Sequence, residues 1–171
     1  MSDFKIEDIF DGKIIKTQTC GDYGRKRVVD CSRYVISLEK KDEKIVKDLN
    51  GNEHTLHKVY RKNTTNRTNI QWKSGGYIEH ENNLDSSLTS TAWINSTSYV
   101  YGNARVEGGA HICGANTVIC DNAKISGNAK VWNNTIICSD AQISDNAQVE
   151  NSWVGDNVKI GDNTILYSGV K

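Results

Sequence analysis

The sequence of 171 residues contains no proline, although average usage of about 5% would give such a chain roughly eight or nine. No apolar run approaches the ~18 residues of a membrane-spanning helix, so we expect no membrane partner. The first residues, MSDFKIEDIF, carry acids where a secretory signal carries basic residues. These absences predict a cytoplasmic protein.

Metal and cofactor motifs are also missing. The five cysteines include no Cys-x-x-Cys pair, which predicts free thiols in a reducing compartment and no metal site. There is no GxxxxGK[ST] phosphate loop, no GxSxG elbow and no HExxH helix, so we expect no cofactor. The 21 basic and 21 acidic residues cancel, which argues against a protein that coats nucleic acid by charge alone.

The chain divides into two halves of different composition. Residues 1–82 contain 16 Lys and Arg against 13 Asp and Glu, whereas residues 83–171 contain 5 against 8. The first half is irregular and charged. The second is rich in Asn, Ala, Gly, Ser and Thr, and its pattern repeats about every six residues. We predict a small, β-rich N-terminal interaction domain over 1–82 and a repeat domain over 83–171.

Each repeat ends in an aliphatic residue and has a small residue two positions earlier. Because side chains two apart in a strand point to the same face, both should point inward and the residue between them outward. Asn, Asp and Gly between repeats tolerate the left-handed backbone of a sharp corner. Three such strands make a coil of about 18 residues, and stacked coils share one core. The closing aliphatics are Leu88, Ile94, Val100, Val106, Ile112, Ile119, Ile125, Val131, Ile137, Ile143, Val149, Val154, Ile160 and Leu166.

These repeats have a family resemblance. The segment VGDNVKIGDNTIL (154–166) resembles the hexapeptide repeat of left-handed parallel β-helix proteins, whose best-known members are trimeric acyltransferases. The segment YGNARVEGGAHI (101–112) is more similar to the Gly-Asn-Ala-x-Val repeats of phage and prophage proteins. The resemblance covers 83–171 and implies a left-handed parallel β-helix. The predicted fold is therefore mostly all-β, with that β-helix preceded by a small antiparallel β or α+β domain.

The outward residues form three columns when the repeats are assigned in turn to faces a, b and c. An apolar stripe on a protein surface is normally covered, and face c is apolar along its height. We predict that face c is an interface, covered by another copy in a dimer or trimer, by the N-terminal half, or by a foreign partner. Face a carries Ser87, Arg105, Lys124, Gln142 and Lys159; face b carries Trp93, His111, Lys130, Gln148 and Ile165; face c carries Tyr99, Val118, Ile136 and Trp153.

Two cysteines of the repeats should stack at one corner. Cys120 and Cys138 are 18 residues apart and should lie on adjacent coils, in one column with Tyr101. No histidine falls in that column, so a stack of small apolar residues is favoured over a metal or redox pair. Cys113 should lie in a different column.

His111 is the single histidine of the repeat region. The acyltransferases that the repeats resemble use a histidine as general base at a subunit boundary. His111 would therefore be the catalytic residue if this chain took acyl groups from acyl-CoA. We find no excursion loop that would build an acceptor pocket, and no other candidate catalytic residue.

The N-terminal half predicts a short helix over 3–10, then strands over 13–19, 26–38, 44–49 and 55–60. Asn50-Gly51 predicts a hairpin turn between the last two strands. His54 and His57 are three apart and should point to opposite faces of their strand, which makes them a poor metal pair. Gly75-Gly76 indicates a loop.

The stretch from 60 to 77 interleaves basic and aromatic residues and contains no acid. It could follow a nucleic-acid backbone and stack bases, contact an acidic protein surface, or be a linker strand with ordinary core aromatics. The linker strand is the favoured interpretation, and as a ligand a protein or a nucleotide is favoured over nucleic acid. The candidate partner-binding residues are Tyr60, Arg61, Lys62, Arg67, Trp72 and Lys73.

Three functions agree with these features. The first is a non-catalytic binding protein of a phage or mobile element that oligomerises through the β-helix and inhibits or sequesters a host protein complex in the host cytoplasm. An anti-CRISPR protein is a concrete form of it. The second is a hexapeptide acyltransferase, and the third is a structural phage or filament component. We expect the first, by analogy, because one fold carries many functions.

Overall fold

The computed structural model describes residues 34–37, 40–66, 69–87, 89–95 and 97–168, with side chains described outside 62–72. This part of the chain is built of strands and contains two short 3-10 helices but no α-helix. It holds no helix with the length and hydropathy of a membrane span. The predicted helix over 3–10 and strand over 13–19 lie outside the described residues.

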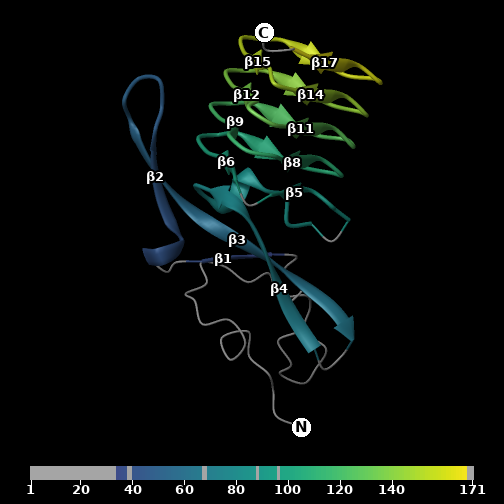
Figure 1. The fold of residues 1–171 in the computed structure, drawn as a ribbon. Helices are drawn as coiled ribbons and strands as arrows, with labels where there is room; N and C mark the ends of the chain where they lie inside the picture. Colours follow the sequence, from purple (N-terminus) through teal and green to yellow (C-terminus); the bar gives the residue numbers. More distant parts are fainter. Residues whose placement is uncertain (1–33, 38–39, 67–68, 88, 96, 169–171) are drawn as a thin grey trace.

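The C-terminal part is a parallel β-helix whose strands stack in three sheets (Figure 1). The predicted fold class is thereby confirmed. Each sheet contains one predicted face, and the strands pair in the predicted register. Face a comprises β7 (Arg105–Val106), β10 (Lys124–Ile125), β13 (Gln142–Ile143) and β16 (Lys159–Ile160); face b comprises β5 (Trp93–Ile94), β8 (His111–Cys113), β11 (Lys130–Trp132), β14 (Gln148–Glu150) and β17 (Ile165–Tyr167); face c comprises β6 (Ser98–Val100), β9 (Thr117–Ile119), β12 (Ile136–Ile137) and β15 (Trp153–Val154).

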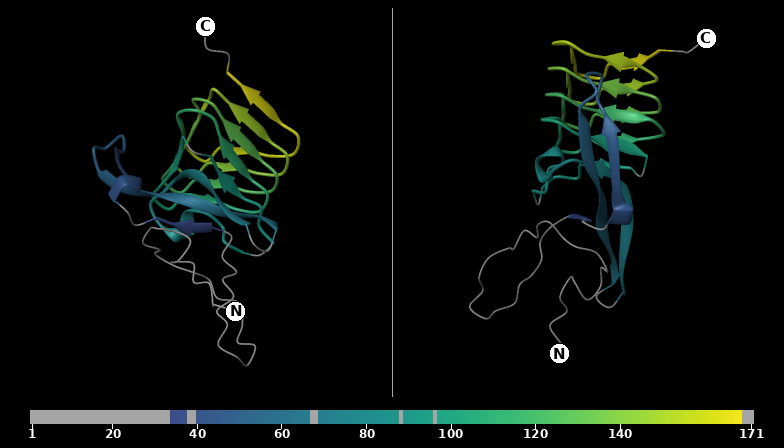
Figure 2. Two further views of the ribbon diagram at one scale, coloured as in Figure 1. Left: turned by 60° about the horizontal axis from the view of Figure 1, so that its bottom comes forward. Right: turned by 90° about the vertical axis from the view of Figure 1, so that its left-hand side faces the viewer.

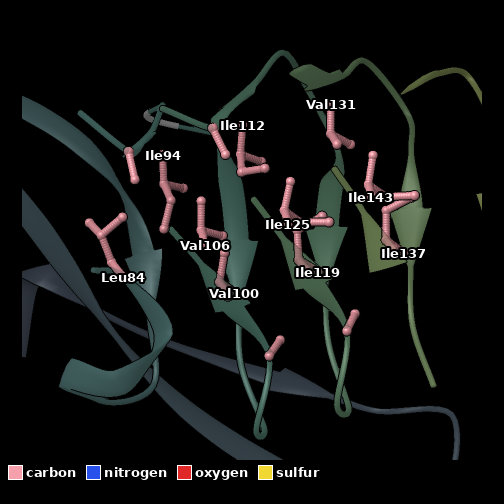
Figure 3. Close-up of a cluster of buried hydrophobic side chains, with 14 of the residues drawn as sticks. Leu84, Ile94, Val100, Val106, Ile112, Ile119, Ile125, Val131, Ile137 and Ile143 are labelled. Atoms are coloured by element: carbon pink, nitrogen blue, oxygen red, sulfur yellow. The ribbon is translucent and has the colours of Figure 1, made fainter. Parts of the chain in front are cut away.

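The predicted inward residues form one continuous core. The closing aliphatics from Ile94 to Val149 are fully buried, and Val154 is nearly so. Figure 3 shows these side chains stacked along the inside of the coils. The two ends differ from the prediction. At the C-terminal end, Ile160 and Leu166 are only partly buried. At the start, Leu84 forms the bridge to Val106, so the position predicted for Ser87 at the base of face a is wrong, while Leu88 lies outside the described residues.

The corners use the residues that tolerate a left-handed backbone. Asp121, Asp145 and Asp162 have φ of 58°, 56° and 56°, in the region that Asn, Asp and Gly adopt most readily. Exposed side-chain amides also stack from coil to coil. Asn122 Nδ2 donates to Asp140 Oδ1 over 3.0 Å, from residues 18 apart in sequence. The corner chemistry therefore fixes where each strand ends.

The N-terminal strands extend the sheet of face c. That sheet has eight strands, because β4 pairs with β6 on one side and β3 on the other. This sheet crosses residue 82, where we divided the chain, and the division into two domains stays a prediction. The N-terminal elements are β1 (Tyr34–Ile36), η2 (Lys40–Asp42), β2 (Glu43–Lys47), β3 (Glu53–Asn66), β4 (Asn69–Ile78) and η3 (Glu81–Asn83).

Strands β3 and β4 also cross beneath the first coil (Figure 2). Gly75 and Gly76 lie inside β4, so the loop predicted for them is wrong. A Cβ at Gly75 would lie 2.6 Å from Trp93 Cζ2, and one at Gly76 would lie 2.5 Å from Ile94 Cγ2. Two glycines are needed there because the strand passes directly against β5. The antiparallel strands thus close the lower end of the core.

A buried asparagine joins the two parts. Asn83 is fully buried, and its Oδ1 accepts hydrogen bonds from the backbone N–H groups of Glu79 and His80 at 3.1 and 2.9 Å. Its Nδ2 donates to the carbonyls of Gly102 and Ala104 at 3.0 and 2.8 Å. The side-chain amide thus makes all four of its hydrogen bonds, two as acceptor and two as donor, and these hold the end of β4 on the first coil.

Candidate binding surface

Four basic side chains come together where β3 and β4 meet face b. We call Arg61, Lys73, His111 and Lys130 the basic cluster. Arg61 lies directly opposite Lys73 in the β3–β4 ladder, and His111 lies directly opposite Lys130 in face b. The guanidinium of Arg61 joins the two pairs, because its Cζ lies 4.9 Å from the ring centroid of Trp93, the residue next to His111 in face b.

The pKa of His111 reflects the same grouping of basic side chains. Burial lowers the pKa of His111 below its ordinary value of 6.5, and the nearby charges of Arg61, Lys130 and Lys73 lower it further. The contributing charges are all positive. His111 is half-buried, whereas Lys73 and Lys130 are exposed. Among the described residues, the cluster is therefore a partly solvent-facing site of positive charge.

In the described part of the chain, no acid pairs with the cations of this cluster. Arg61, Lys73 and Lys130 form no ion pair there, in contrast to Arg105 and Lys124 of face a. There, Glu107 holds Arg105 Nε at 2.9 Å and Lys124 Nζ at 2.7 Å. Like charges directly opposite in a sheet are destabilising. Arg61 and Lys73 form such a pair, which is an unfavourable arrangement for the isolated molecule, and His111 opposite Lys130 forms a second one when the imidazole is protonated.

The predicted partner-binding residues are divided by the structure. Arg61 and Lys73 enter the basic cluster. Tyr60 instead donates its hydroxyl to Asp42 Oδ1 over 3.0 Å. Lys62 and Trp72 lie opposite each other in the β3–β4 ladder, and Arg67 lies outside the described residues.

Face c is partly covered by the chain itself. The hairpin of β2 and β3 stands beside the coils (Figure 2), and the predicted turn at Asn50-Gly51 joins its strands. Tyr99 and Val118 pack against a cluster that includes Leu56 of this hairpin. Higher up, Ile136 and Trp153 are 39% and 63% exposed. The predicted interface therefore has a covered lower part and an open upper part.

The cysteine column lies under the same hairpin. Cys120 and Cys138 are buried in one cluster with Tyr101 and Leu56, as the stack of small apolar residues predicts. Burial is the main cause that raises the pKa of the Cys120 thiol, to about 12, so it is a poor nucleophile. In the described residues, no group of three or more His, Cys, Asp and Glu side chains is placed to hold a metal ion.

In the residues that the structure describes, His111 forms no hydrogen bond or ion pair with an acid that would orient it as a catalytic base. The charges around it come from Arg61, Lys130 and Lys73, and its two neighbours in face b are Trp93 and Lys130. Its lowered pKa keeps the imidazole neutral at neutral pH, a state that can accept a proton. What sequence reasoning missed is the link to β3 and β4, which depends on Arg61 reaching Trp93.

Comparison with known proteins gives one short match. Residues 99–114 match the family model described as the YdcK beta solenoid repeat. No curated protein matches the chain. The matched segment contains β6, β7 and β8, one strand from each face. The chain is thus a β-helix repeat protein that is similar, over those residues, to the YdcK beta solenoid repeat.

Proposed function

We propose that this protein is a non-catalytic binding protein that holds an acidic surface of a partner protein on its basic cluster. The observation that carries the proposal is the like-charge pair of Arg61 and Lys73, which lies near His111 and Lys130 and has no ion pair with an acid in the described residues. Such repulsion is relieved when carboxylates of a partner reach the cluster. Charged complementarity of this kind steers association and fixes its register.

The β-helix gives the cluster a rigid base. His111 and Lys130 stand on adjacent strands of a parallel sheet, about 4.8 Å apart, above a fully buried core. Arg61 lies over the ring of Trp93, which restricts the guanidinium. A preorganised surface loses little conformational entropy on binding. A partner with a matching row of acids would therefore be bound without rearrangement of the sheet.

The aromatic residues favour a protein ligand over nucleic acid. Stacking of bases needs exposed aromatic faces. Trp93 is only 3% exposed, Tyr60 is bonded to Asp42, and Tyr77 packs beside Tyr99 with ring centroids 5.8 Å apart. These described rings are used in packing, which favours the charged side chains of Arg61 and Lys73 as the means of recognition.

The finer form of the proposal follows from the repeat style. The Gly-Asn-Ala-x-Val repeats resemble those of phage proteins, so the partner would be a component of a bacterial host, and its inhibition or sequestration the outcome. A host-defence complex is the concrete candidate. Self-association through face c belongs to the same proposal. The change Trp153→Arg should then lower the native mass, and an unchanged mass would count against a homo-oligomer.

An acyltransferase is the second candidate, because a neutral His111 beside three cations could face the phosphates of acyl-CoA. Binding of acetyl-CoA, measured by calorimetry and lost in His111→Ala, would favour this reading. A structural role as a filament component predicts instead that the native mass grows with protein concentration.

The binding proposal is tested with two labelled probes, an oligoglutamate peptide and an oligothymidylate, by fluorescence anisotropy. The variant Lys73→Glu/Lys130→Glu should lose at least about tenfold in affinity for the peptide. The control Lys124→Glu/Lys159→Glu makes the same change in net charge on face a and should change it by less than about threefold. Equal losses in the two variants would contradict the proposal. Tighter binding of the oligothymidylate would replace the protein partner with nucleic acid.

A further inference from the structure

The hairpin of β2 and β3 forms an arm, defined here as residues 43–57. Within the arm β3 pairs with β2, and β3 pairs with β4 only from His57 onward. The arm is therefore joined to the rest of the sheet at its base, while its upper part stands beside the coils (Figure 1). Its position depends on the side chains that contact the β-helix.

The inner side of the arm carries apolar contacts. Leu56 is fully buried and packs with Tyr101, Cys120 and Cys138, and Val46 packs against the same cluster. Lys44 Nζ lies 4.5 Å from the ring centroid of Tyr99 and donates a hydrogen bond to its hydroxyl. These contacts cover the lower part of face c and the cysteine column.

A histidine between two carboxylates lies at the centre of this contact. His54 Nδ1 is 2.9 Å from Glu79 Oε1, at the end of β4, and His54 Nε2 is 3.6 Å from Asp48 Oδ2, in the arm's own turn. The imidazole lies against the ring of Tyr101 with centroids 4.7 Å apart. The second oxygen of Glu79 accepts the backbone N–H of Gly102 over 2.7 Å. One imidazole thus links the arm, β4 and the corner of the first coil.

We propose that His54 is a proton-dependent latch, whose imidazolium holds the arm on the β-helix and whose deprotonation releases it. The proposal is independent of the basic cluster. Asp48 faces His54 from the arm, Glu79 from the end of β4 and Tyr101 from the β-helix, and a second histidine, His80, lies near Glu79.

The direction of the switch follows from the proton equilibria. The hydrogen bond to Glu79 is the main cause that raises the pKa of His54, and Asp48 raises it further, while burial opposes both. A group whose pKa is raised in the docked state stabilises that state below its ordinary pKa. This contribution is lost as pH rises through the docked value. The pKa values of Asp48 and Glu79 are lowered, so both carboxylates stay ionised over this range.

Release would lengthen the apolar surface of face c. Tyr99 and Val118 are half-buried under the arm, and Ile136 and Trp153 above them are already exposed. With the arm displaced, these four residues would form one uninterrupted stripe. Cys120, a residue now 7% exposed, would be uncovered by the same movement, and the reactivity of its thiol can report it.

The test measures the alkylation of Cys120 by iodoacetamide, read by peptide mass spectrometry. The protection of Cys120 is defined as the alkylation rate in urea divided by the alkylation rate in the native protein at the same pH. The fraction of thiolate rises with pH in both samples, so the ratio largely removes that effect. Wild-type protection should fall by about threefold to tenfold between about pH 5.5 and pH 8. In His54→Gln it should be low and independent of pH, and Glu79→Gln should lower it as well.

Two controls separate release of the arm from loss of the fold. Glu53→Gln removes an exposed carboxylate of the same arm, which pairs with Lys47, and should leave protection at the wild-type value. Cys113 lies on β8 of face b, so its labelling should be the same in every variant. Wild-type protection that does not change with pH would overturn the proposal. So would a His54→Gln variant that protects Cys120 as well as the wild type.

Discussion

Faces a and b of the β-helix have the same backbone, but their basic side chains differ in whether they form ion pairs. On face a, one carboxylate, that of Glu107, holds both Arg105 and Lys124. On face b, His111 and Lys130 pair with no acid among the described residues, and Arg61 and Lys73 add positive charge from β3 and β4. A paired surface is satisfied within the molecule, whereas an unpaired one gains free energy from a partner. On this difference we propose face b as the binding face.

The largest effect should come from testing which residues point inward. Val131 is fully buried, and its neighbour Lys130 is exposed. We expect Val131→Asp to lower the free energy of unfolding by more than about 3 kcal/mol, because it buries an unpaired carboxylate. Lys130→Asp should change it by less than about 0.5 kcal/mol. Urea titration of both variants measures this. Similar losses would mean that the faces are assigned incorrectly.

Much of this comparison could be read from the sequence. The spacing of aliphatic residues located faces a, b and c, because each coil repeats the same inward positions and the corners are set by Asn, Asp and Gly. The stacking of His111 below Lys130 followed from the same register. The hairpin around Asn50-Gly51 was predicted from its turn residues.

The contribution of β3 and β4 to the site could not be predicted. Arg61 joins face b because β4 crosses beneath the first coil, and that crossing depends on Gly75 and Gly76, which look like a loop signal in the sequence. Their close approach to Trp93 and Ile94 is a tertiary contact with no local periodicity. The docking of the arm on face c is of the same kind, since Leu56 and Tyr101 are far apart in the chain.

An acid introduced into face b should make it resemble face a. Gln148 lies directly opposite Lys130, so Gln148→Glu should pair with that lysine and compete with the partner's carboxylates. We expect a loss of about threefold to tenfold in affinity for oligoglutamate, measured by anisotropy. Gln142→Glu is the matched change on face a, beside the already paired Lys124, and should have little effect. A stronger loss in the face a variant would reverse the assignment.

Binding should also depend on pH through His111. Its pKa is lowered in the free protein by burial and by Arg61, Lys130 and Lys73. An acidic partner offsets those charges and raises that pKa, so binding takes up a proton. Affinity should rise a few-fold as pH falls toward about 5, where Glu side chains are still ionised. His111→Gln should remove this dependence. An affinity that falls in the same interval would contradict the role of the cluster.

The smallest effect on affinity is expected from removing the carboxylate that pairs with the cations of face a. Glu107→Gln removes the partner of Arg105 and Lys124 and leaves a second unpaired column. We expect about a twofold gain in affinity for oligoglutamate, since exposed pairs contribute little. If this variant bound oligoglutamate at low salt with the affinity of the wild type, ion pairing would not explain why face b binds and face a does not.

The most direct test is capture of the partner from a bacterial host lysate by three forms of the protein, with native mass read on the eluate. The forms are the wild type, Lys73→Glu/Lys130→Glu on face b with β4, and Lys124→Glu/Lys159→Glu on face a. We predict a stoichiometric acidic partner with the wild type and the face a variant, and none with the face b variant. A partner that stays bound to the face b variant would contradict the account.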